Sequence, residues 1–145
     1  FFGPLVGSVA RVVSGPLADR IGGGILTCFS GVGIAAAALF TSGHLSPDSS
    51  ADFAPFFWGM MVIFFFTGVG NASTFKQMPM IFAPRQAGGV LGWTAAIAAF
   101  GPFIFGVLLS IFAPENFFLA ISAFSIVGAG IAWWFYARVN AEAKS

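Results

Sequence analysis

GPLVGSVARVVSG, residues 3–15, is a run of small and apolar residues that contains a single charge, that of Arg11. Arg11 shares one helix face with Gly7 and Gly15, because residues four apart lie on the same side of a helix. A guanidinium group cannot lose its proton to escape an apolar setting. The stretch therefore predicts a helix of the membrane interior. Its one charged side chain must have a structural partner or a ligand there.

The composition of the whole chain is that of a membrane protein. Of its 145 residues, 58% are hydrophobic and only 8% are charged, whereas soluble domains carry roughly 25% charged residues. The net charge of +1 argues against nucleic-acid binding, and the single Cys28 excludes a disulfide within the chain. Because the sequence offers no metal-ligand cluster and no nucleophile–base set, we expect no enzyme, no metal and no cofactor.

Apolar runs of helical length predict five transmembrane helices in an all-α fold. About twenty residues at ~1.5 Å each cross the ~30 Å hydrocarbon core. Asp19 and Arg20 are expected in a short loop after the first helix, between Gly15 and Gly22, and Pro102 is expected to kink the fourth helix. The expected helices are residues 1–18, 24–43, 56–82, 88–112 and 117–137, followed by a polar tail at 138–145.

Positive charges lie in every second connection of this arrangement. The connections at 44–55 and 113–116 hold no Lys or Arg. Because cytoplasmic loops carry the excess of Lys and Arg, we expect a multi-pass protein of the inner (cytoplasmic) membrane with a cytoplasmic C-terminus. The positive residues on the cytoplasmic side are then Arg20, Arg85, Arg138 and Lys144.

Arg11 is the first candidate binding residue. It lies eight residues before Asp19, hence ~12–14 Å into the membrane and near the midplane. Ionisable side chains at this depth mark functional sites, and the forked guanidinium matches a planar oxyanion. Since no Asp or Glu lies within the five expected spans, we expect Arg11 to bind an anion; the alternative is a structural contact inside the bundle. Gly7 gives room for a substrate or allows close helix packing.

Two further stretches hold candidate residues. The glycines and Pro79 of residues 67–79 predict a locally irregular helix, in which Asn71 binds substrate or joins helices. Lys76 reaches the cytoplasmic surface, where it snorkels or takes part in gating. Residues 88–103 form a small-residue helix face, which is either a packing seam or a surface that lets the backbone approach the substrate.

Three of these stretches together resemble a known family. Residues 15–23, GPLADRIGG, are similar to the G-x-x-x-D-R-x-G-G loop of the major facilitator superfamily. Residues 7–23, which include this loop, together with residues 68–82 and 88–102, resemble NarK-type transporters of the nitrate/nitrite porter family. The resemblance implies helices eight to twelve of a twelve-helix fold. Because the sequence starts with Phe1 inside an apolar run, we expect it to be the C-terminal part of a longer protein, with the N-terminal half as its missing partner.

The resemblance also assigns roles to residues. Arg11 would be one of two arginines that clamp nitrate or nitrite, its partner lying on the absent second helix. Gly92 and Gly101 match glycines of the family's signature helix, whereas Ala98 stands where members often have glycine. Asp19 and Arg20 of the loop motif would belong to the cytoplasmic gate, at the side of the membrane where Lys76 is expected from its own position in the sequence.

The function expected from this resemblance is transport of nitrate and/or nitrite across the bilayer, as nitrate/nitrite antiport by alternating access. The absence of Asp and Glu from the expected spans favours antiport over proton-coupled nitrate uptake, which stays an alternative. A transporter of the same superfamily for another small anion is a second alternative. A non-transporting membrane anchor is a third and less favoured one.

Overall fold

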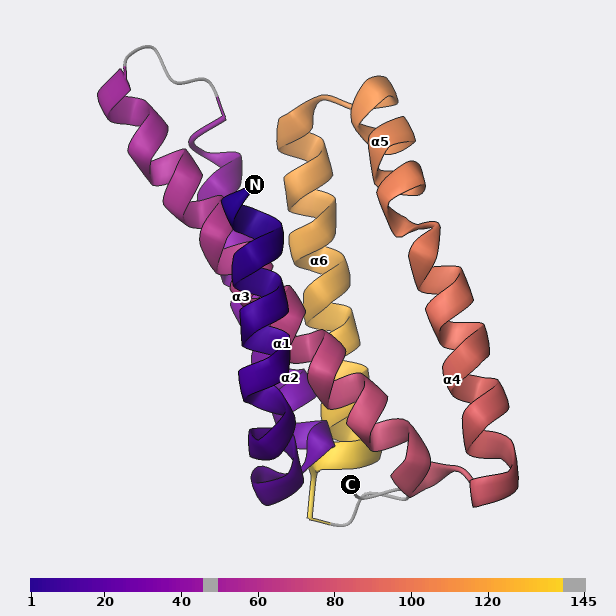
Figure 1. Cartoon of the computed structure of the whole chain (residues 1–145). Helices are drawn as coiled ribbons and strands as arrows, with labels where there is room; N and C mark the ends of the chain where they lie inside the picture. Colours follow the sequence, from indigo (N-terminus) through magenta and orange to yellow (C-terminus); the bar gives the residue numbers. More distant parts are fainter. Residues whose placement is uncertain (46–49, 140–145) are drawn as a thin grey trace.

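The computed structural model describes residues 1–45 and 50–139, and within them the chain is helical with short connections and no strand (Figure 1). Lys144 and most of the expected polar tail lie outside the described residues. The helices in chain order are α1 (Phe2–Ile21), α2 (Gly23–Ser42), α3 (Ser50–Ile81), α4 (Pro84–Ala99), α5 (Gly101–Ile111) and α6 (Pro114–Ala132), and α6 runs into the π-helical turn η1 (Trp133–Ala137).

Four segments are long and apolar enough to cross a membrane: Gly23–Ser42, Phe53–Ile81, Pro84–Ile111 and Pro114–Ala137. The helix α1 has the same length as α2, 20 residues, but is less apolar because it contains Arg11, Asp19 and Arg20. The expectation of an all-α, multi-pass membrane protein is confirmed.

The first connection is shorter than the sequence predicted. Helix α1 continues through Pro16 to Ile21, and Gly22 alone, at φ 95°, separates it from α2. Glycine is the residue that adopts this left-handed backbone without strain, which explains why the helix stops there. Asp19 and Arg20 therefore lie in the last turn of α1, and the expectation that they lie in a loop is wrong.

Helix α3 is continuous where an irregular segment was expected. Residues 67–79 are α-helical throughout. The hydroxyls of Ser73 and Thr74 donate to the carbonyl oxygen of Gly70 within the same helix, at 3.0 and 2.8 Å. The glycines of this segment are used for close packing instead: a Cβ at Gly68 would overlap the carbonyl oxygen of Gly7. The prediction of local unwinding is therefore wrong.

The expected kink near Pro102 is confirmed. The helix is interrupted at Phe100, between α4 and α5, because proline lacks the N–H that would continue the hydrogen-bond pattern. The helices α4 and α6 start earlier than expected, at Pro84 and Pro114. Proline suits a first helical turn, where its missing N–H needs no partner in the helix.

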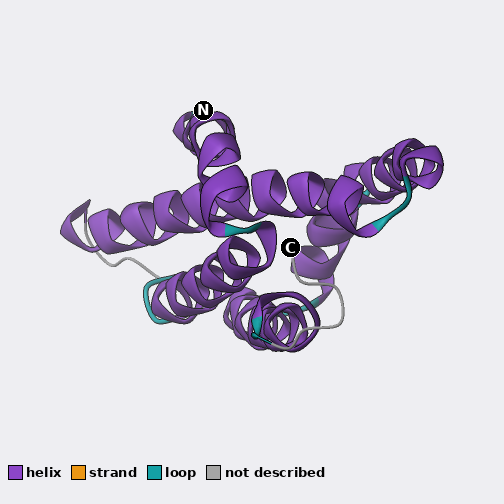
Figure 2. Ribbon diagram, turned by 90° about the horizontal axis from the view of Figure 1, so that it is seen from below, coloured by secondary structure: helices purple, strands orange, loops and turns teal. Residues whose placement is uncertain are grey.

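Helix α3 lies between α1 and α2, and α2 also packs along α6 (Figures 1 and 2). The α2–α3 contact includes a hydrogen bond between the hydroxyls of Thr27 and Ser73, at 2.8 Å. In the α2–α6 contact, Ser122 donates to the carbonyl oxygen of Ala35 at 2.9 Å. Such small residues and short polar side chains let helices approach closely in a bilayer.

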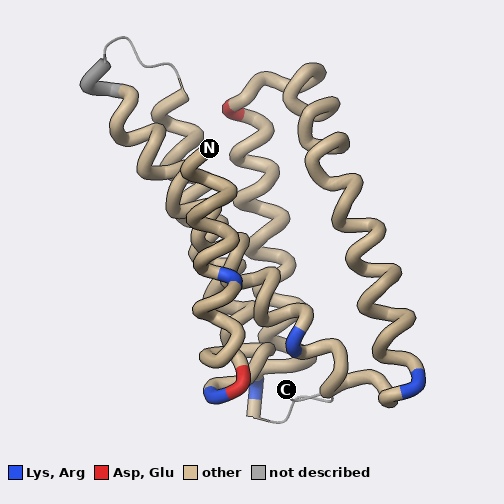
Figure 3. The backbone as a smooth tube through the Cα atoms, in the orientation of Figure 1, with Lys and Arg blue, Asp and Glu red and all other residues tan. Residues whose placement is uncertain are grey.

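The pair α4–α5 stands apart from the other helices except near its ends (Figure 1). The Lys and Arg residues gather where α1 ends and α4 begins, apart from one in the middle of α1, while an acidic segment at the start of α6 lies at the opposite end (Figure 3). At the positive end, the Arg138 guanidinium lies 4.1 Å from the centre of the Trp134 ring.

Candidate functional site

Arg11 lies in the middle of α1, nine residues after Phe2 and ten before Ile21. At ~1.5 Å per residue it is ~13–15 Å from either end of the helix. The neighbouring Ala10 and Ser14 are buried, whereas Arg11 lies on the exposed side of α1. Among residues 1–45 and 53–139, whose side chains the structure describes, the one ion pair does not include Arg11, so no carboxylate among these residues neutralises it.

A hollow of about 350 Å³ opens beside the Arg11 side chain. The guanidinium carbon lies 5.6 Å from the centre of the Phe75 ring, a cation–π distance. The ring face attracts the guanidinium and holds it beside the hollow, and the forked guanidinium suits a planar monovalent anion. Its lining comes from three helices: Arg11 and Gly15 of α1, Ala72, Phe75 and Lys76 of α3, and Leu91 of α4.

Lys76 and Asp19 form an ion pair between α3 and α1. The Lys76 Nζ lies 2.7 Å from Oδ2 and 2.9 Å from Oδ1 of Asp19. A carboxylate in the last turn of a helix faces the negative end of the helix dipole, and the ammonium offsets this repulsion. Arg20 follows in the same turn, where a cation is favourable. These three candidate gate residues therefore gather at one end of the α1–α3 contact.

The two glycines beside Arg11 have different surroundings. A Cβ at Gly7 would lie 3.1 Å from the carbonyl oxygen of Phe64 in α3, so Gly7 serves the helix contact. A Cβ at Gly15 would meet only the Lys76 Cε within 4 Å, at 3.9 Å. Of the two interpretations of Gly7, the geometry favours close packing, while Gly15 leaves space beside the hollow.

Asn71 does not line the Arg11 hollow, although the next residue, Ala72, does. The Asn71 Oδ1 is buried without a hydrogen-bond partner in the described part of the chain. A carbonyl oxygen repels an anion, so only the amide nitrogen of Asn71 could serve as an anion ligand.

Gly92 and Gly101 are also apart from Arg11. Neither lines the hollow, and a Cβ at either position would meet no described atom within 4 Å. Of α4 and α5, only Leu91 in α4 lines the hollow. The structure therefore places Lys76 beside both the Arg11 hollow and Asp19, and leaves the two signature glycines on an open face of α4–α5.

Phe75 is the site residue that sequence reasoning missed. It is one of 20 phenylalanines in the chain, and nothing in its local sequence distinguishes it. Its relation to Arg11 depends on the close packing of α1 against α3 at Gly7 and Gly68. The glycine spacing in both stretches was the available signal, since it indicates that the two helices can approach closely.

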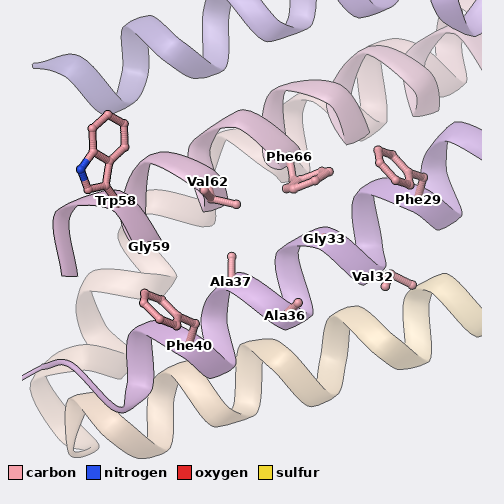
Figure 4. Close-up of a pocket in the computed structure, with 10 residues that line it drawn as sticks. All are labelled: Phe29, Val32, Gly33, Ala36, Ala37, Phe40, Trp58, Gly59, Val62 and Phe66. Carbon is pink, nitrogen blue, oxygen red and sulfur yellow. The ribbon is translucent and has the colours of Figure 1, made fainter. Parts of the chain in front are cut away.

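A second hollow, of about 400 Å³, lies between α2 and α3 (Figure 4). The only side-chain polar atom drawn in it is the indole nitrogen of Trp58, and its other side chains are apolar. Without a cation or several N–H donors, this hollow cannot replace the water that an anion would lose on entering. Of the two hollows, only the one beside Arg11 suits an anion.

The chain is similar to nitrate/nitrite transporters. It is 51% identical over 147 residues to the probable nitrate/nitrite antiporter NarK2 of Thermus thermophilus, covering 98% of the chain and 33% of that protein. It is 30% identical over 166 residues to the nitrate/nitrite transporter NarU of Escherichia coli K12, covering 95% of the chain and 36% of that protein. The chain thus spans about a third of the length of these curated relatives.

No family model and no solved structure matches the chain. The similarity to the two transporters nevertheless covers 98% and 95% of the chain. Nearly the whole chain is therefore homologous to a segment of the NarK-type nitrate/nitrite transporters that makes up about a third of their length. This confirms its resemblance to that family.

Proposed function

We propose that the chain is part of a nitrate/nitrite transporter of the inner membrane, in which Arg11 binds the anion. The observation that carries the proposal is the Arg11 guanidinium at mid-helix, which has no ion-pair partner among the side chains that the structure describes and opens with Phe75 onto a hollow, in a chain 51% identical to a probable nitrate/nitrite antiporter. Nitrate and nitrite are planar and monovalent, so a forked donor binds two of their oxygens at once.

The chain acts together with further transmembrane helices, and the remaining two thirds of its relatives' length would supply them. In this arrangement the described helices are helices eight to twelve of twelve, within the second six-helix half. Superfamily substrates bind between the two halves near the midplane, which is the level of Arg11. The exposed side of α1 then faces the first half, and a second cation from that half completes the anion clamp.

The exchange of nitrate for nitrite is the favoured mode of transport. A proton-coupled symporter needs a titratable group near the substrate path. In the described residues, the carboxylate nearest in sequence to Arg11 is Asp19, in the last turn of α1, where Lys76 holds it. Antiport needs no such group, because the two anions carry the same charge and use the same site in turn.

The orientation follows from the charge distribution. The end of α1 and the start of α4, which carry Arg20 and Arg85, face the cytoplasm, as does the C-terminus after Arg138. The gate formed by Asp19, Arg20 and Lys76 is then the cytoplasmic one.

The test uses a hybrid transporter, defined as the Thermus thermophilus relative in which this chain replaces the homologous third. Purified hybrid in liposomes should take up labelled nitrate when nitrite is loaded inside, and an imposed proton gradient should not replace the nitrite. Arg11→Lys should reduce uptake by at least ~100-fold, because lysine keeps the charge but loses the fork. Arg85→Lys is the matched control and should leave uptake unchanged.

Three results would contradict parts of this proposal. Uptake by Arg11→Lys near that of the unchanged hybrid would show that the guanidinium is not the ligand. Uptake that follows the proton gradient without internal nitrite would favour proton-coupled nitrate uptake. A hybrid that elutes as a folded monodisperse protein but binds and moves neither anion would favour a transporter for another small anion or a membrane anchor.

A further inference from the structure

Lys76 takes part in two arrangements at the same time. Its ammonium binds both carboxylate oxygens of Asp19, at 2.7 and 2.9 Å. Its side chain also lines the hollow beside Arg11. The proposed function uses Arg11 as the anion ligand and leaves open why a second cation of the same chain borders the same hollow.

The geometry of α1 places Lys76 between the hollow and the ion pair. Arg11, Gly15 and Asp19 follow one another at intervals of four residues on one face of α1, so each step is ~6 Å along the helix. The Lys76 Cε lies 3.9 Å from the position that a Cβ of Gly15 would occupy. The lysine side chain therefore crosses α1 midway between Arg11 and Asp19, and rotation of its flexible stem carries the ammonium toward either one.

We propose that Lys76 is a movable second cation for the transported anion, and that Asp19 holds it away from the hollow until an anion enters. The inference rests on the proposed function, because it concerns the same anion at the same site. With no anion bound, the Lys76 ammonium pairs with Asp19. When nitrate or nitrite binds at Arg11, the ammonium leaves Asp19 and binds the anion from the opposite side.

The charges and the burial of the pair support this exchange. The side chains of Lys76 and Asp19 are 48% and 55% exposed, and ion pairs with this much exposure are weak. The ammonium keeps a negative partner in both positions, and the Asp19 carboxylate that it leaves is exposed enough for water to solvate it. Asp19 itself lies ~12 Å along the helix from Arg11, too far to contact an anion that is bound at Arg11. Asp19 therefore acts on the hollow chiefly through Lys76.

A double-mutant cycle in the hybrid transporter tests the coupling. Asp19→Asn frees the ammonium, so the KM for nitrate should fall by about fivefold to tenfold, and turnover should fall because the anion leaves more slowly. In a Lys76→Met background, Asp19→Asn should change the KM by less than about twofold. Arg85→Gln, which removes a charge from the same end of the helices, is the control for a general change of potential and should leave the KM unchanged.

A cross-linking measurement tests the movement independently of transport. A water-soluble carbodiimide activates the Asp19 carboxyl, and the Lys76 amine attacks it to form an amide while a urea leaves. Peptide mass spectrometry should detect this amide in the hybrid without anion, and saturating nitrate should reduce its yield at least about threefold. Gluconate at equal ionic strength is the control for salt screening and should leave the yield unchanged.

The possible failures are distinguishable. An unchanged cross-link at a nitrate concentration that saturates binding would overturn the movement of Lys76. An equal effect of Asp19→Asn on the KM in both backgrounds would overturn the coupling between the two residues. A folded hybrid with Arg11 intact that binds no nitrate at all would overturn the proposed function, and the role of Lys76 with it.

Discussion

The carbonyl oxygen of Gly7 in α1 occupies the space that a Cβ of Gly68 in α3 would need. The Cβ of Ala10 lies on the same side, 3.0 Å from that position. The two helices therefore touch through their backbones at this point. Arg11 lies one turn after Gly7 on α1, and Phe75 lies two turns after Gly68 on α3. The contact between the two glycines therefore sets the distance between the guanidinium and the ring.

We predict that Gly68→Ala destabilises the protein. The new methyl group forces α1 and α3 apart, and overpacking of this kind costs about 1–3 kcal/mol in free energy of unfolding. The apparent Tm of the detergent-solubilised hybrid should fall by several degrees, and nitrate affinity should fall with it. Gly88→Ala is the matched control, because a Cβ at Gly88 would meet no described atom within 4 Å. Equal Tm values for the two variants would contradict the importance of the Gly7–Gly68 contact.

We also predict that Phe75 holds the Arg11 side chain in its binding position. Phe75→Leu keeps an apolar side chain but removes the cation–π contact, which is worth about 0.5–2 kcal/mol. The KM for nitrate should therefore rise by about threefold to tenfold, with the Tm nearly unchanged. Phe75→Trp keeps an aromatic face and should restore most of the affinity. A Leu variant with an unchanged KM, or a Trp variant as weak as the Leu variant, would show that the ring has no such role.

The fold was predictable to the extent that it depends on apolar run length. Of the site, the charged residues Arg11, Asp19 and Lys76 were predictable, but Phe75 and the contacts between the residues were not. Twenty-residue apolar runs and Pro102 predicted the helices and the kink, because both effects are local. The positions of helix ends failed where a local signal was ambiguous: Gly15-Pro16 looked like a helix end, yet Gly22 is the residue with the left-handed backbone. The pairing of Lys76 with Asp19, 57 residues apart in the sequence, depends on how α1 packs against α3.

Ser73 should contribute more to the stability of the protein than Ser110, although both make the same kind of hydrogen bond within their own helix. Both Ser73 and Ser110 donate to a carbonyl oxygen three residues earlier in their own helix. Ser73 is fully buried and its hydroxyl also bonds the Thr27 hydroxyl in α2, whereas the Ser110 bond is exposed. Interhelical hydrogen bonds in membranes average about 0.6 kcal/mol, with a maximum of about 1.7 kcal/mol.

Ser73→Ala should therefore lower the apparent Tm of the hybrid by a few degrees, and Ser110→Ala should leave it unchanged. Thr27→Val combined with Ser73→Ala should cost less than the sum of the two single changes, because each single variant leaves one hydroxyl without its partner. Strictly additive effects would mean that the hydrogen bond between the hydroxyls contributes nothing measurable.

The size of the side chain at position 15 should control whether Lys76 reaches Asp19. A Cβ at Gly15 would be in ordinary contact with the Lys76 Cε, at 3.9 Å, so Gly15→Ala should keep the ion pair and near-normal transport. Gly15→Leu places three further carbons in the path of the lysine stem and fills part of the hollow. We expect it to abolish the carbodiimide cross-link between Lys76 and Asp19 and to reduce nitrate uptake at least about tenfold. A leucine variant that keeps both the cross-link and the uptake would show that the lysine stem does not pass over Gly15.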